Sequence, residues 1–143
     1  MGDDTIRLLR ECNAGIKMGL SALDDVLEHV ANEKLRSLLL QSHDTHSRLG
    51  EDTRRYLEKY HDEGKEPAAM AKMMSWVKTN VKLGSEESDR VVADLITDGC
   101  NMGVKTLYRY LHQYPAAQQQ VKDLVMEVIE AEDTLVKEMR DYL

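Results

Sequence analysis

Two segments of this chain repeat each other at nearly the same spacing. Residues 12–17 read Cys-Asn-Ala-Gly-Ile-Lys, and residues 100–105, which lie 88 positions later, read Cys-Asn-Met-Gly-Val-Lys. Arg-Arg-Tyr-Leu at 54–57 returns as Arg-Asp-Tyr-Leu at 140–143, 86 positions later. Two matches at nearly equal offsets, with both cysteines of the chain aligned, indicate a duplicated structural unit. The chain is therefore expected to build its fold from two similar halves.

Four long segments carry apolar residues at the spacing of an α-helix. The sequence has no phenylalanine and no alternating run of β-branched residues, so we expect no strands. The predicted long helices cover 4–30, 33–61 and 86–113, and a last one starts at Pro115. Between the second and third of these, the Gly- and Pro-containing segment 62–67 ends the preceding helix.

Capping residues and loop lengths determine the expected topology. Asn32 and Ser85 are placed to cap the second and third long helices. The first two helices share a very short turn, and so do the last two, so each pair is expected to form an antiparallel hairpin. A connection of roughly 25 residues, with a shorter helix over 68–83, joins the two hairpins.

These features predict an all-α fold. We expect a four-helix bundle with one long crossover that contains a short extra helix, built from an internally duplicated helical hairpin. The whole chain, 1–143, is predicted to be one domain, with hairpin 1 over 4–61, the crossover helix over 68–83 and hairpin 2 over 86–143. A chain of this length can bury a sizeable hydrophobic core.

The charge balance narrows the classes of partner. The net charge is −7 and the basic residues are scattered among acids, which argues against nucleic acid as a partner. No apolar run approaches the roughly 18 residues that a membrane span needs. The acidic start, Met-Gly-Asp-Asp, lacks the apolar region of a secretory signal. We therefore expect a cytoplasmic protein, with no membrane partner, in which both cysteines are free thiols.

Three motifs spread over most of the chain carry a family resemblance. They are Asn-Ala-Gly-Ile at 13–16, Met-Ser-Trp-Val-Lys at 74–78, and Gly-Cys-Asn-Met-Gly-Val-Lys at 99–105 with Tyr108. With these motifs the chain resembles an uncharacterised bacterial family of ferritin-like four-helix bundles. The resemblance implies the ferritin-like fold and brings no established activity with it.

The residues of this chain can be compared with those of the di-iron centre in ferritin-like proteins. Such centres use a Glu from each of two helices and a Glu-x-x-His motif from each of the other two. Here the second long helix offers His43-Asp-Thr-His46, and the last one offers Glu130-Ala-Glu132-Asp. Neither segment contains Glu-x-x-His, so we expect neither ferroxidase nor oxygen chemistry, and we predict no catalytic residues.

Each long helix has one polar residue within its apolar stripe. These residues are Asn13, His46, Asn101 and Glu132. The 86-residue offset relates His46 to Glu132, and the 88-residue offset relates Asn13 to Asn101. The sequence thus predicts a buried polar layer at the centre of the bundle.

A buried Glu132 needs compensation, because an unpaired buried carboxylate costs several kcal/mol or becomes neutral. His46 could bind it, or Lys17 or Lys105 could pair with it. Either solution makes the layer a structural network that fixes the register of the helices. A bound cation is the third solution.

The cation alternative predicts a reduced metal site. Its ligands would be His43, His46, Asp98 and Glu132, and it would hold one iron or zinc ion. The two histidines are three residues apart and can share one face of a helix. A second hypothesis for the interior pairs the thiols of Cys12 and Cys100 across the internal symmetry axis.

The leading functional hypothesis is a non-enzymatic structural or protein-interaction bundle with a degenerate ferritin-like centre and no cofactor. We expect a homo-oligomer, most simply a dimer, or a protein partner that binds the crossover helix. The residues predicted to form that surface are Met70, Met73, Met74 and Trp76. The alternative hypothesis is a metal-binding or redox protein that uses the reduced His/Glu site.

Overall fold

The computed structural model describes residues 2–62 and 86–143. Four long helices account for most of these residues, and no strand occurs among them. The helices are α1 (Gly2–Leu27), α2 (Glu33–Lys59), α4 (Glu86–Gln113) and α5 (Gln119–Met139), followed by the short 3₁₀ helix η1 (Arg140–Tyr142). The all-α, four-helix prediction is confirmed. The predicted crossover helix at 68–83 and the predicted cap Ser85 lie outside the described residues.

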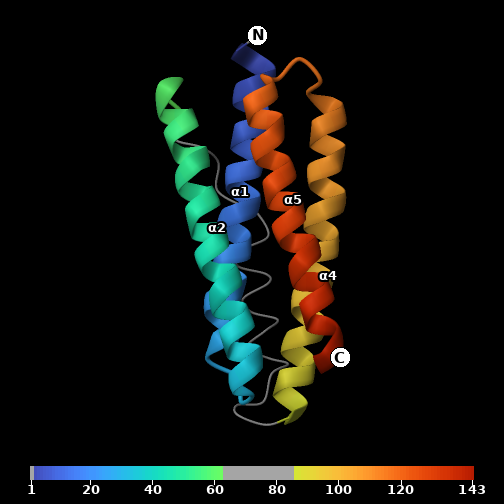
Figure 1. The fold of residues 1–143 in the computed structure, drawn as a ribbon. Coiled ribbons are helices and arrows are strands. Elements are labelled where there is room, and N and C mark those ends of the chain that lie inside the picture. The colour runs from blue at the N-terminus through green and yellow to red at the C-terminus, as the bar shows by residue number, and fades with distance from the viewer. Residues whose placement is uncertain (1, 63–85) are drawn as a thin grey trace.

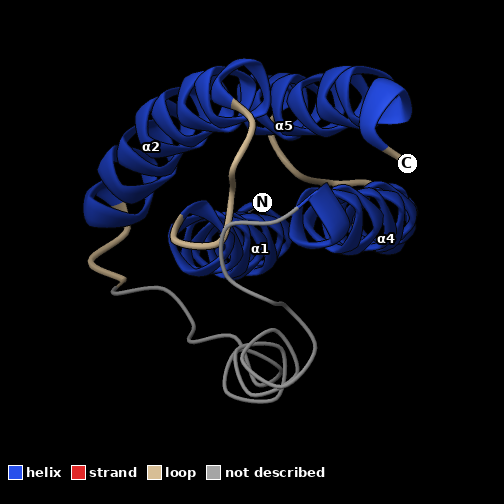
Figure 2. Ribbon diagram, turned by 90° about the horizontal axis from the view of Figure 1, so that it is seen from below, coloured by secondary structure: helices blue, strands red, loops and turns tan. Residues whose placement is uncertain are grey.

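The four helices form two layers. Seen along the bundle axis, α1 and α4 lie on one side and α2 and α5 on the other (Figure 2). α1 packs along α2 and α4, and α5 packs along α4 and α2. α1 and α5 run down the bundle in Figure 1, whereas α2 and α4 run up, so neighbouring helices are antiparallel. α2 ends at the opposite end of the bundle from the start of α4, as the predicted long crossover requires.

The turn between α1 and α2 is held from both sides. Asn32 caps α2 as predicted, since its side chain accepts a hydrogen bond of 2.9 Å from the backbone N–H of Leu35. From α4, the carboxylate of Asp89 accepts hydrogen bonds from the backbone N–H groups of Ala31 (2.7 Å) and Asn32 (3.1 Å). The Ser88 hydroxyl donates to the carbonyl of His29 at 2.7 Å. The start of the second hairpin is thereby fastened to the turn of the first.

Replacing Asp89 with Ala is expected to lower the free energy of unfolding by about 1 kcal/mol, because two charge-assisted hydrogen bonds are lost. The loss stays modest because Ala31 and Asn32 are exposed, so water can bind their freed N–H groups. Urea unfolding would measure the change. The control is Asp94→Ala, which removes an exposed carboxylate from the same helix and should change stability little. An equal loss in both variants would contradict this role for Asp89.

α5 begins later than the sequence predicts. We expected the last helix to start at Pro115, and it starts at Gln119. The backbone N–H of Ala116 donates to the Asp4 carboxylate at 3.0 Å, and that of Gln118 donates to the Thr5 hydroxyl at 2.9 Å. The first turn of α1 thus binds the backbone before α5 and holds it in a loop. These hydrogen-bond partners are more than 100 residues away in the sequence, so local sequence patterns do not reveal them.

The hydrophobic core has two clusters, one toward each end of the bundle. One contains Leu9, Ile16 and Leu49, and the other contains Leu23, Leu39 and Leu135. Between them lie His46 on α2 and Glu132 on α5, both buried. The core is therefore interrupted by polar side chains at mid-height.

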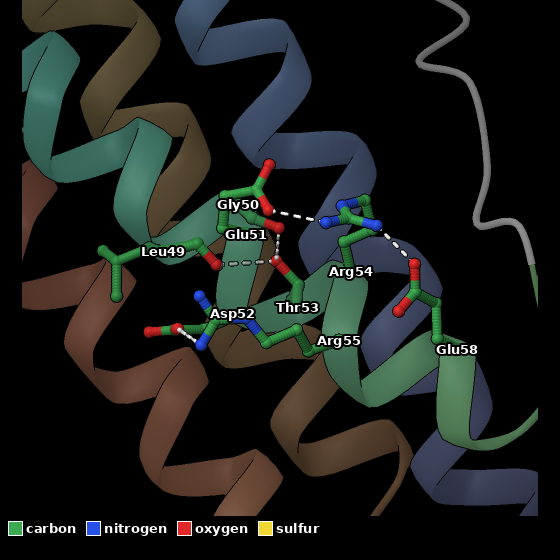
Figure 3. A network of polar contacts seen from close by, with 8 residues as sticks. All are labelled: Leu49, Gly50, Glu51, Asp52, Thr53, Arg54, Arg55 and Glu58. Atoms are coloured by element: carbon green, nitrogen blue, oxygen red, sulfur yellow. Dashed lines mark hydrogen bonds and ion pairs between the residues drawn. The ribbon is translucent and has the colours of Figure 1, made fainter.

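The outer face of α2 carries ion pairs within the helix (Figure 3). Arg54 pairs with Glu51 at 2.8 Å and with Glu58, and Arg55 pairs with Asp52 at 3.6 Å. Such exposed pairs contribute little to stability. They do balance the two adjacent arginines, so this Arg-Arg sequence forms no uncompensated basic patch. None of the described helices combines the length and the apolar character that crossing a membrane requires.

Candidate functional site

A groove of about 140 Å³ lies between α1 and α4 at the middle of the bundle. Four glycines, two from each helix, line it: Gly15, Gly19, Gly99 and Gly103. Aliphatic side chains form most of the remaining wall, among them Leu23, Val26, Ile96 and Leu107. His46 and Glu132 reach the groove from α2 and α5, which form the other layer. The groove is thus an apolar site with two polar residues contributed from the opposite layer.

Two of the glycines leave space for the polar side chains. A Cβ atom at Gly103 would lie 2.4 Å from Oε2 and 2.8 Å from Oε1 of Glu132. A Cβ atom at Gly19 would lie 3.4 Å from Cδ2 and 3.7 Å from Nε2 of His46. Each polar side chain therefore points at a glycine on the facing helix. A Cβ atom added at Gly15 or at Gly99 would meet nothing within 4 Å, so these two glycines widen the groove.

Glu132 is buried without a hydrogen-bond partner at one oxygen. The residue is only 7% exposed, and its Oε2 atom has no hydrogen-bond partner. Burial raises the pKa of Glu132 to about 8, with a smaller contribution from the negative charge of Asp133. The carboxyl group is therefore mostly protonated at neutral pH. A buried acid with a raised pKa in a groove is a candidate functional group.

His46 is neutral and has a defined tautomer. Its Nδ1 lies 2.8 Å from the carbonyl oxygen of Ser42, which can only accept, so Nδ1 carries the proton. The Ser42 hydroxyl lies 3.3 Å from the same nitrogen. Burial lowers the pKa of His46. Its Nε2, on the side of Gly19, is consequently a hydrogen-bond acceptor.

Both cysteines lie near Glu132. Cys12 and Cys100 are buried, unbonded thiols. Burial raises the pKa of Cys12 to about 12 and raises that of Cys100 as well, and the negative charge of Glu132 adds to both shifts. The thiols therefore stay protonated and are weak nucleophiles.

The predicted polar layer is only partly present. Asn13, His46 and Glu132 are buried as expected, but the prediction was wrong for Asn101, which is exposed. α1 packs against α2, α4 and α5, so a wide face of it is covered, whereas α4 packs mainly against α1 and α5. Asn101 follows Cys100 on the narrower face and turns outward. Asn13 lies in the depression between α1 and α2, away from the groove.

The predicted metal ligands do not converge. Nε2 of His43 lies 2.7 Å from a carboxylate oxygen of Asp24 on α1, and Asp98 is exposed on α4. Only His46 and Glu132 of the predicted set line the groove. Within 2–62 and 86–143, no three His, Cys, Asp or Glu side chains are grouped in a way that could hold a metal ion. The predicted partner surface at Met70, Met73, Met74 and Trp76 lies outside the described residues.

The sequence predicted His46 and Glu132 as polar residues of the site but did not predict the groove. The signal was available in the glycines, because Gly15, Gly19, Gly99 and Gly103 lie inside long helices, where glycine costs about 1 kcal/mol relative to alanine. These glycines lie at the same height in the bundle as the predicted polar layer, which would have suggested a shared site. The spacing alone does not tell whether such glycines bring two helices together or leave a space between them.

Comparisons with known proteins give a likeness of fold. No family model and no curated protein sequence matches the chain. The crystal structure of rv2844, a conserved hypothetical protein from Mycobacterium tuberculosis, is similar with a TM-score of 0.77. The match covers 100% of this chain and 99% of that one, at 13% sequence identity. At this identity the likeness concerns the fold of the whole chain and does not extend to function.

Proposed function

We propose that this protein is a non-enzymatic binding protein, a ferritin-like four-helix bundle whose central site is degenerate. The antiparallel packing of neighbouring helices with one long crossover supports the ferritin-like assignment. The observation that carries the functional proposal is the state of Glu132, a buried acid in an apolar groove with an unpartnered oxygen.

The residues of the groove do not fit a di-iron centre. Such a centre needs several carboxylates to balance the charge of two ions, and each carboxylate must be ionised to bind. Among the described residues, the carboxyl groups that line the groove are those of Glu132 and Glu11, and His46 is the one histidine. The protonated thiols of Cys12 and Cys100 and the neutral His46 do not form an activated nucleophile either. These properties support binding rather than catalysis.

The second candidate is a reduced metal site for one iron or zinc ion. It is favoured by the fact that His46 and Glu132 line the same groove. A metal there would have two protein ligands, whereas structural and catalytic zinc sites use three or four.

Metal analysis and thermal melting distinguish the two candidates. Protein purified without a His-tag and without added metal is expected to contain less than about 0.1 equivalent of any transition metal. Its melting temperature should stay the same when EDTA, zinc or ferrous iron is added, because a ligand that does not bind the folded state cannot stabilise it. The control is Glu132→Gln, which lacks the acid. Stoichiometric metal, or a rise of several degrees that this variant loses, would overturn the proposal.

A further inference from the structure

The groove holds a buried hydrogen-bond acceptor that the protein itself does not satisfy. Glu132 is nine-tenths buried, its Oε2 is unpartnered, and both carboxyl oxygens point at Gly103 in the groove wall. Nε2 of His46 is a second acceptor, because the other ring nitrogen carries the proton that Ser42 binds. An occupant that brings N–H donors would satisfy Oε2 of Glu132 and would also find an acceptor at Nε2 of His46.

We propose that the α1–α4 groove binds a small organic amine as its ammonium ion, with the apolar body between the two helices and the ammonium group at Glu132 and His46. This inference rests on the proposed function and specifies its ligand. The ammonium donates hydrogen bonds to the Glu132 carboxylate and to Nε2 of His46. Oε2 of Glu132 would then no longer be buried without a partner.

The size and lining of the groove determine the apolar part of the ligand. Its volume of about 140 Å³ resembles that of a cavity of about 150 Å³ that binds benzene. Aliphatic residues and glycines line most of it, so the body should be a benzene-sized hydrocarbon. The groove lining includes no Lys or Arg among the described residues.

The charged and titratable groups around Glu132 favour a cation. α1 contributes Cys12 and, at the groove wall, Glu11; α2 contributes His46; α4 contributes Cys100. On its own helix Asp133 adds negative charge. Each of these groups is neutral or acidic at pH 7, so an anion would gain no cationic partner. An ammonium ion would compensate the charge that Glu132 acquires when it ionises.

Binding is coupled to the loss of one proton. The protonated Glu132 releases its proton to solvent when the ammonium ion takes its place, so the reaction is R–NH₃⁺ plus Glu–COOH giving the ion pair plus H⁺. Since the pKa of Glu132 is about 8, the affinity should rise about tenfold per pH unit up to that pH and then level off.

Isothermal titration calorimetry with benzylamine tests this inference. Benzyl alcohol and benzoate are the neutral and anionic comparisons of similar shape. Wild-type protein at pH 8 is expected to bind benzylamine about tenfold or more tightly than benzyl alcohol, because a charge-assisted hydrogen bond is gained. Benzoate should bind least. Between pH 6 and 7 the affinity for benzylamine should increase by about tenfold.

Two variants test whether Glu132 causes the preference for benzylamine. Glu132→Gln keeps the shape of the side chain and should remove both the preference for benzylamine and its pH dependence. Glu130→Gln, which changes an exposed acid on the same helix, should keep both. Equal binding of amine and alcohol by the wild-type protein, no detectable binding of benzylamine, or an unchanged Glu132→Gln would overturn the inference. None of these results would restore a metal site, whereas stoichiometric metal in the purified protein would overturn the proposed function itself.

Discussion

Glu132→Gln is expected to stabilise the protein at pH 8 by about 3–5 kcal/mol. The pKa of Glu132 is raised from 4.5 to about 8, mainly by burial. The folded state therefore binds the proton more tightly than the unfolded state does. Below pH 4.5 both states are protonated, and Glu132 has no cost. As the pH rises to about 8, the unfolded state ionises freely while the folded state resists, so stability is lost.

Glutamine reproduces the shape of the protonated acid and cannot ionise. The difference between wild type and Glu132→Gln should therefore be close to zero at pH 4.5 and grow steadily toward pH 8. Urea unfolding at several pH values measures it. Glu130→Gln is the matched control, because Glu130 is exposed on the same helix and its substitution should be nearly neutral at every pH. A constant difference between wild type and Glu132→Gln across this range would mean that Glu132 is solvated or paired.

A stabilising substitution at the centre of the bundle bears on function. Glu132 lowers stability at neutral pH, and the neighbouring groups do not offset this cost, because Oε2 has no partner and the ring of His46 binds Ser42. Residues with such a cost are typical of binding and active sites, where stability and function are in conflict. The acid that is unfavourable for folding is also the group that would recognise a cation.

Local patterns predicted the helices well, and the reason is visible at their ends. Glu86 and Gln113 bound α4 as expected, and Asn32 caps α2 through its own side chain. These signals lie within a few residues of the ends that they determine. The start of α5 was predicted four residues too early, because its preceding loop is held by Asp4 and Thr5 on α1.

The internal repeat predicted part of the site. The 86-residue offset matched His46 with Glu132, and both are buried and line the groove. The 88-residue offset matched Asn13 with Asn101, and only the first is buried. Equivalent positions in the two hairpins have different neighbours, because α1 touches α5 across the bundle. The repeat thus predicts which helix a residue lies on, but its burial depends on packing between the hairpins.

The groove itself could not be read from either hairpin alone. It forms where α1 of the first hairpin faces α4 of the second, and its polar atoms come from α2 and α5. A pattern within one helix does not specify the distance to a helix 80 or more residues away. The identity of the side chain opposite each glycine is likewise a property of the assembled bundle, and it can be tested directly.

Gly103→Ala is expected to stabilise the protein less than the roughly 1 kcal/mol by which alanine is the better helix former, because the end of a buried side chain has to move aside. The added Cβ would meet Oε2 of Glu132 at 2.4 Å, and the buried carboxyl would have to move. Gly99→Ala is the matched control on the same helix. The Cβ atom that it adds would meet nothing within 4 Å, so Gly99→Ala should stabilise the protein by about 0.5–1 kcal/mol. Urea unfolding of both variants measures the difference between them.

A double substitution identifies the cause of the smaller gain. If the carboxyl of Glu132 is what Gly103 accommodates, Gly103→Ala should recover the full stabilisation in a Glu132→Ala background, whereas in a Glu132→Gln background, where the side chain keeps its size, it should not. The coupling between positions 103 and 132 should then be about 0.5–1 kcal/mol. Additive effects of Gly103→Ala and Glu132→Ala would contradict a contact between Glu132 and position 103. In that case the groove would lose its acceptor, and the recognition of a cation by Glu132 would have no geometric basis.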